Sequence, residues 1–239
     1  MRRETQNILL VLLGGALLKI SFTGTYLRYV KPSHQWLLIT AGAIMVLLAL
    51  LSIGRDLINN RQAAAVDGHE GHTHSSTGAW LLLLPVLAVF LVAPPALGAD
   101  SVTRAATTNR AVDDGRAVFP PLPAGDVIAL PLSDFSARAA WDEGNSLNDR
   151  SIKLTGFVVH DGSAAYIARL AIGCCAADAF PIKVRLDDNP DATALPDDTW
   201  IEAVVSLKPG TATRENDYVP AAAALELREI PQPEDPYEH

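Results

Sequence analysis

One short segment of the chain, IGCCAADAF at residues 172–180, gathers the residue types best suited to chemistry. It holds both cysteines of the 239-residue chain, Cys174 and Cys175, side by side, and Asp178 follows three residues later. Thiolates and carboxylates are ligands for zinc and similar divalent cations, although a closed zinc site has about four ligands and the Cys-x-x-Cys spacing is absent. A metal site with an incomplete ligand set is therefore one interpretation of this segment.

Three other interpretations compete with a metal site. Neighbouring cysteines can form a strained and therefore redox-active disulfide. Arg169 could lower the pKa of the Cys175 thiol and make it a reactive thiolate. The small residues around the pair could instead serve only to allow a tight turn and close packing, since free cysteine is commonly buried.

A strand that continues through this segment would point the two thiols in opposite directions, because successive side chains of a strand face opposite sides. Cys174 then shares a face with the apolar Leu170 and Ile172, while Cys175 shares a face with Arg169. We therefore predict a buried Cys174 and an exposed or partner-facing Cys175.

A second group of potential ligands lies in a histidine-rich loop at residues 55–78. His69, His72 and His74 stand close together in the sequence DGHEGHTHSSTG. Closely spaced imidazoles in a Gly/Ser-rich loop can bind zinc or a similar ion weakly. The alternative is a flexible polar linker whose histidines bind nothing specific.

Lys19 is an ionisable residue inside an apolar run at residues 8–27. An ionised group deep in a bilayer is costly and is a functional candidate for that reason. The alternative is that the long side chain extends to the membrane interface.

The sequence contains few residues or motifs that are typical of an enzyme active site. His160 and the terminal His239 are the only histidines after residue 100, and no nucleophile elbow, paired-acid motif or phosphate-binding GxxxxGK[ST] loop is present. We therefore expect a protein without catalytic activity.

Three apolar runs, at residues 8–27, 36–54 and 79–98, predict three transmembrane helices. Each reaches the roughly 20 residues of helix that a bilayer core of about 30 Å requires. The alternative for the first run, a cleaved signal peptide, is disfavoured because a second apolar run follows at once. Residues 1–98 are thus predicted to form a multi-pass region in the cell membrane.

Basic residues near the ends of the runs favour a cytoplasmic N-terminus. Arg2 and Arg3 precede the first run, and Arg55 and Arg61 follow the second. Lys and Arg in short loops favour the cytoplasmic side. The C-terminal part of the chain is then extracytoplasmic.

The C-terminal part is predicted to consist of a linker at 99–125 and an OB-like β-barrel domain at 126–239, so that the whole chain is of the α+β class. Residues 131–144 favour a short helix. Alternating apolar and polar residues predict five strands. These strands lie at residues 151–160, 164–173, 181–186, 199–207 and 224–230.

The predicted barrel is acidic. Residues 100–239 contain twelve Lys or Arg against twenty-three Asp or Glu, a formal balance of −11. Single-stranded nucleic acid needs a basic groove with aromatic stacking platforms. We therefore exclude nucleic acid as a partner.

The segments TGTYLRYVKPSHQWLLITAGAIMVLLAL, KLTGFVV and above all RLAIGCCAADAFPIKV make the chain similar to a family of small bacterial membrane proteins of the YcgQ type. The resemblance implies an accessory subunit that works with a larger multi-span permease in a two-component complex. It brings forward Arg169, Cys174, Cys175, Asp178 and Pro181 as motif positions without assigning them a chemistry.

Two functions are therefore expected. In the first, the protein is a non-catalytic accessory subunit of a membrane permease complex, and its acidic outer barrel binds or gates a cation. In the second, it is a stand-alone membrane-tethered protein that uses Cys174 and Cys175 for thiol or metal chemistry, with a divalent ion such as zinc.

Overall fold

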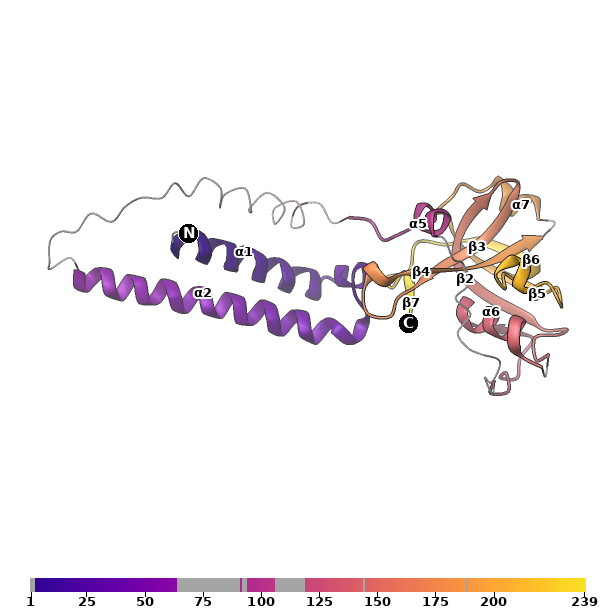
Figure 1. Cartoon of the computed structure of the whole chain (residues 1–239), viewed down its shortest axis with the longest axis horizontal. Coiled ribbons are helices and arrows are strands. Elements are labelled where there is room, and N and C mark those ends of the chain that lie inside the picture. Colours follow the sequence, from indigo (N-terminus) through magenta and orange to yellow (C-terminus); the bar gives the residue numbers. More distant parts are fainter. Residues whose placement is uncertain (1–2, 64–90, 92–93, 106–118, 144, 188) are drawn as a thin grey trace. The chain divides into compact units, whose positions relative to one another are not determined.

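The computed structural model describes residues 3–63, 91, 94–105, 119–143, 145–187 and 189–239. The chain divides into two units, Met1–Pro95 and Ala96–His239. Figure 1 shows helices in the first unit and a sheet with short helices in the second.

The described residues of the first unit form two long helices, α1 (Arg3–Phe22) and α2 (Gln35–Ala63), joined through the 3-10 turns η1 (Thr25–Arg28) and η2 (Pro32–His34). The two helices lie side by side in Figure 1. Their backbones meet at two glycines: a Cβ added to Gly14 would lie 2.8 Å from the carbonyl oxygen of Gly42, and the reverse distance is 2.9 Å. Small residues permit this close approach of helices.

The prediction of three transmembrane helices is only partly met. Among the described residues, one helical segment, Pro32–Asp56, is long and apolar enough to cross a membrane, with a mean hydropathy of 2.5 over its apolar window. The first predicted run is interrupted because α1 ends at Phe22 and Gly24 adopts a left-handed φ of 77°, which leaves a shorter apolar helix at Gln6–Phe22. Most of the third predicted run, 79–98, lies outside the described residues.

In the part of the second unit that the structure describes, there are seven strands and three short helices. The strands are β1 (Val127–Ala129), β2 (Ser151–Asp161), β3 (Ala164–Ala171), β4 (Phe180–Asp187), β5 (Trp200–Leu207), β6 (Ala221–Glu229) and β7 (Tyr237–Glu238). The helices are α5 (Ala99–Arg104), α6 (Leu132–Trp141) and α7 (Pro190–Ala194), with 3-10 turns η3 (Ala176–Asp178) and η4 (Arg214–Asn216). The five predicted strands and the predicted helix therefore correspond to β2 to β6 and α6.

The strands form one mixed sheet in the order β1-β2-β5-β6-β4-β3-β7, and β2 also pairs with β3. The extra pairing curves the sheet strongly, while β1 and β7 extend it by parallel pairing with β2 and β3. The prediction of an OB-like barrel is therefore met in part: β2, β5, β6, β4 and β3 pair in a ring, within a sheet of seven strands. The sequence pattern did not predict β1 and β7, because they have three and two residues, too few to show an alternation.

Gly156 allows β2 and β3 to pass closely where their pairing begins. A Cβ at this position would lie 2.5 Å from the carbonyl oxygen of Ala168. Every side chain larger than hydrogen would collide with the neighbouring backbone, so the pairing of β2 with β3 depends on this glycine.

Apolar side chains are buried on both faces of the sheet. The main core lies between the sheet and α6, and its fully buried members include Leu132, Phe135, Ile152, Leu154, Ile167 and Val184. A second, smaller core joins Phe157, Leu170 and Trp200 to Ala99 and Val102 of α5.

Helix α5 shows that the predicted linker at 99–125 begins with a packed element. The backbone N–H of Ala99 donates a 2.6 Å hydrogen bond to Asp198 Oδ1, and Val102 is buried in the second core. Only two buried side chains anchor this six-residue helix. That is too few to produce a periodic signal in the sequence.

Candidate metal centre

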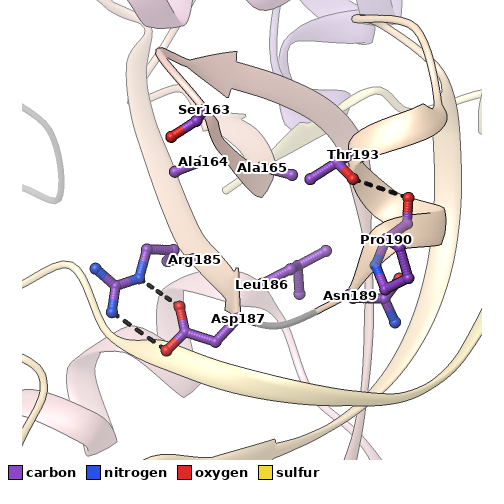
Figure 2. A pocket seen from close by; sticks show the side chains of 9 residues that line it. All are labelled: Ser163, Ala164, Ala165, Arg185, Leu186, Asp187, Asn189, Pro190 and Thr193. Carbon is purple, nitrogen blue, oxygen red and sulfur yellow. Dashed lines mark hydrogen bonds and ion pairs between the residues drawn. The ribbon is translucent and has the colours of Figure 1, made fainter.

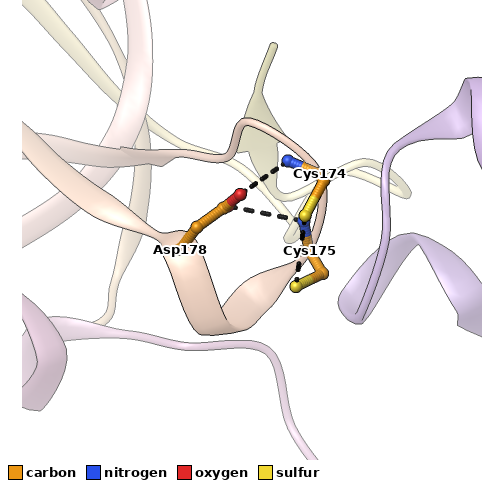
Figure 3. Close-up of side chains that lie close together, drawn as sticks. All are labelled: Cys174, Cys175 and Asp178. Carbon is orange, nitrogen blue, oxygen red and sulfur yellow. Dashed lines mark hydrogen bonds between the residues drawn. The ribbon is translucent and has the colours of Figure 1, made fainter.

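The candidate metal centre is the loop between β3 and β4, which carries both cysteines and Asp178 (Figure 3). Cys174 is exposed and Cys175 is half-buried. This corrects the prediction of a buried Cys174. The strand ends at Ala171, so its alternation of faces does not extend to the cysteines.

The carboxylate of Asp178 is held by three consecutive backbone N–H groups. Oδ1 accepts hydrogen bonds from Gly173 at 3.0 Å and from Cys175 at 3.4 Å, and Oδ2 accepts one from Cys174 at 2.8 Å. A Cβ on Gly173 would lie 3.1 Å from Oδ2, so the glycine leaves room for the carboxylate. Asp178 thereby fixes the backbone that carries both thiols.

The spacing of the ligand atoms fits a single cation. The two sulfur atoms lie 3.6 Å apart, and the two sulfurs and a carboxylate oxygen of Asp178 all lie within 4.8 Å of one another. Two thiolates on one tetrahedral zinc, each with a Zn–S bond of about 2.3 Å, are about 3.8 Å apart. The spacing of the two sulfurs is therefore close to that of two thiolates on one tetrahedral ion, and a carboxylate oxygen lies within 4.8 Å of both.

The electrostatics of the loop keep the Cys174 sulfur protonated in the absence of metal. Its hydrogen bond with Asp178, and then its contact with Cys175, raise the pKa of the Cys174 thiol to about 11. The Cys174 side chain and the three backbone N–H groups in turn hold the pKa of Asp178 below its usual range. A cation held by these residues would have to displace the proton of Cys174, and it would find the carboxylate of Asp178 already ionised.

Arg169 is not directed at the thiols. Its Nε and Nη2 atoms donate to the backbone carbonyls of Pro236 at 3.3 Å and Asp235 at 2.7 Å, and the guanidinium lies 5.7 Å from the ring centroid of Trp200. Burial lowers the pKa of Arg169 from its ordinary value. Arg169 therefore ties the C-terminal segment to β3, and the structure gives no support to its predicted role in activating Cys175.

Comparison with known families accounts for most of the chain. Residues 5–107 match the DUF1980 N-terminal domain, and residues 141–239 match the DUF1980 C-terminal domain. The chain contains both DUF1980 domains. No curated protein and no solved structure matches it. The cysteine loop lies wholly within the DUF1980 C-terminal domain, while the likeness to the YcgQ type and the permease role stay expectations.

The other predicted positions lie in the DUF1980 N-terminal domain. Lys19 is exposed in the last turn of α1, close to the helix end, as a side chain that extends to an interface would be. His69, His72 and His74 lie outside the described residues, so their weak metal binding stays a prediction.

A cavity of about 600 Å³ lies in the DUF1980 C-terminal domain beside α7 (Figure 2). Arg185 Nε donates to Asp187 Oδ1 at 2.6 Å, and Lys208 also binds Asp187. Asn189 accepts the N–H of Ala192 and so caps α7. These polar groups satisfy one another, so we assign this cavity no chemistry.

Proposed function

We propose that this protein is a membrane-anchored, non-enzymatic accessory subunit whose C-terminal domain binds a thiophilic divalent cation, such as zinc. Cys174, Cys175 and Asp178 are the proposed ligands. The observation that carries the proposal is the convergence of their three ligand atoms within 4.8 Å of one another.

The dithiol form of the pair is favoured over a disulfide. Adjacent Cα atoms across a trans peptide are about 3.8 Å apart, which is shorter than the spacing of about 4.4–6.8 Å that ordinary disulfides need. A bond between Cys174 and Cys175 would strain the loop that Asp178 holds through three hydrogen bonds. Metal binding, in contrast, uses the sulfur positions nearly as they are.

The ligand set selects the class of cation. Two thiolates suit zinc and softer ions, whereas magnesium and calcium prefer oxygen ligands alone. Three protein ligands leave one tetrahedral position, and both Cys174 and Asp178 are exposed. The bound ion is therefore accessible and exchangeable, which suits capture and transfer better than structural stabilisation.

The membrane role rests on the apolar helices of the first unit. The segment Pro32–Asp56 is long enough to span a bilayer, and several large apolar side chains of both helices are exposed, including Leu13, Phe22, Ile44 and Leu48. In the proposed arrangement these faces contact lipid and a larger multi-span permease subunit, with further spans as predicted from the sequence. The acidic C-terminal domain then lies outside the cytoplasm, and the pairing of β2 with both β3 and β5 supports its OB-like arrangement.

Cobalt titration of the detergent-solubilised full chain tests the metal site. We expect one equivalent of Co²⁺ to bind with thiolate-to-metal charge-transfer absorption, and zinc to displace it. The variants C174S and C175S should lose this absorption and D178N should weaken binding, while D191N, which removes an exposed carboxylate from α7, should bind as the parent does. A parent protein without thiolate absorption would refute the site.

Mild purification from the native membrane tests the accessory role. We expect a larger multi-span protein to co-purify in fixed stoichiometry. Recovery of the protein alone, with the metal site intact, would instead favour the second expected function, a stand-alone membrane-tethered metal-binding protein.

A further inference from the structure

A second cavity lies away from the cysteine loop, and its volume is about 390 Å³. It is bounded by residues of β2 and β3, by the chain end at β7, and by the segment 129–133, in which β1 ends and α6 begins. Small-molecule sites usually have volumes of about 300–1,000 Å³. The cavity is therefore large enough for a small metabolite.

Three basic side chains from three strands or strand ends line this cavity. Lys153 comes from β2, Arg169 from β3 and His239 follows β7. The hydroxyl residues Ser133 and Thr155 add polar groups to the wall. This concentration of donors stands out in a part of the chain whose formal balance is −11.

The basic groups retain donors beyond those used within the protein. Arg169 uses Nε and Nη2 for the carbonyls of residues 235 and 236, and a guanidinium has five N–H groups in all. Lys153 makes a long contact of 3.4 Å to Glu202 with a nitrogen that carries three hydrogens. His239 binds Asp235 through Nε2 at 2.7 Å, and its Nδ1 is a second polar atom.

The one carboxylate in the cavity wall is already engaged. Glu238 is buried, and its two oxygens accept hydrogen bonds from the backbone N–H groups of Leu132 at 2.7 Å and Ser133 at 2.9 Å. These donors form the N-terminus of α6, whose dipole compensates a negative charge. These two donors and the helix dipole compensate part of the negative charge of Glu238.

We infer that this cavity binds a small organic carboxylate, with Lys153 and Arg169 on the carboxylate group. Arginine and lysine form charge-assisted hydrogen bonds with carboxylates, which are stronger than neutral ones. Ala129, Leu130 and Pro131 supply an apolar wall for a short carbon skeleton, a feature that an inorganic anion would not use. The assignment does not depend on metal binding at the cysteine loop.

Succinate binding to the detergent-solubilised full chain, measured by calorimetry, tests this inference. We expect saturable binding that K153M weakens by about tenfold or more, because one charge-assisted interaction is lost. K183M is the matched control, since Lys183 is a partly buried lysine of the same domain outside the cavity, and it should bind as the parent does. The double variant C174S/C175S should also retain binding, which separates this site from the metal centre.

Three results would overturn the inference: no succinate binding by the parent chain, equal binding by K153M, or phosphate binding as tight as that of succinate. Circular dichroism establishes that each variant folds. If K153M does not fold, T155V on the same strand replaces it, and unchanged succinate affinity in T155V counts against the site.

Discussion

The carboxylate of Glu238 accepts a 2.7 Å hydrogen bond from the backbone N–H of Leu132, a residue 106 positions earlier in the chain. With a second bond from Ser133, it caps helix α6 from the last strand of the sheet. Ser133 and Asp134, whose residue types often cap a helix, do not fill this role: Pro131 occupies the N-cap position and makes no side-chain cap. Glu238, which is distant in the sequence, thus caps the N-terminus of α6.

Loss of this cap should destabilise the C-terminal unit. We expect E238A to lower its free energy of unfolding by about 1–2 kcal/mol, because two N–H groups at the helix start lose their acceptor. Urea unfolding of the full chain, followed by the fluorescence of its tryptophans, measures the change. E226A removes an exposed acid from β6 and should have almost no effect; an equal loss in both variants would contradict the role of Glu238.

Alkylation of Cys174 should be slow at neutral pH and accelerate as the pH rises. Its pKa is raised to about 11 because Asp178 and Cys175 disfavour the thiolate. Replacing Asp178 with Asn removes the negative charge, so we expect D178N to lower the Cys174 pKa and speed alkylation by about tenfold for each unit recovered.

The rate of iodoacetamide reaction in a C175S background, followed by mass spectrometry over a pH series, measures this effect. D191N in the same background is the control. Rapid alkylation of the parent Cys174 at neutral pH would show that Asp178 does not restrain the thiol.

Zinc affinity should rise steeply with pH around neutrality. The metal displaces the proton of the Cys174 thiol, whose pKa is raised to about 11, so this thiol alone changes the affinity by about tenfold per pH unit. Asp178 adds no such dependence near neutral pH because its pKa is lowered and it is already ionised. Competition with a chromophoric chelator at two pH values determines the slope; a zinc affinity independent of pH would exclude thiolate ligation.

The contact between Gly14 and Gly42 should control the packing of α1 on α2. A Cβ at Gly14 would lie within 2.8 Å of the Gly42 carbonyl oxygen, whereas a Cβ at Gly15 would meet no atom within 4 Å. We expect G14V to weaken the helix pair by about 1–3 kcal/mol through overpacking. Thermal unfolding in detergent compares it with G15V, which has the same helix propensity and should be much less destabilised. Equal effects would indicate that valine in a helix, and not the contact, is responsible.

Acid should loosen the cysteine loop before it unfolds the sheet. The folded-state pKa of Asp178 is depressed, so its contribution to stability is fully present above the unfolded pKa and is lost as the pH falls through the folded value. The backbone amides of Gly173, Cys174 and Cys175 should lose their protection in this acidic range. Their hydrogen-exchange rates should then exceed those expected from the pH dependence of base-catalysed exchange alone. D178N should show this exposure at every pH, and persistent protection in that variant would contradict the role of the carboxylate.

Local sequence patterns determined much of this protein. The alternation of apolar and polar residues located strands β2 to β6, a short apolar face located α6, and the length of the apolar run located the span within Pro32–Asp56. These features depend on interactions between near neighbours and on solvent exposure, which a single sequence records directly. The grouping of Cys174, Cys175 and Asp178 was likewise visible because the three lie within five residues.

The tertiary structure decided what those patterns could not. It ended β3 at Ala171, which exposed Cys174, and it directed Arg169 to the C-terminal segment. The placement of Glu238 on α6 and of α5 in the second core also depends on residues about a hundred positions apart. Such pairings are selected by the burial and hydrogen bonding of the whole folded unit, because a two-residue strand or a six-residue helix has too few local contacts to be stable alone.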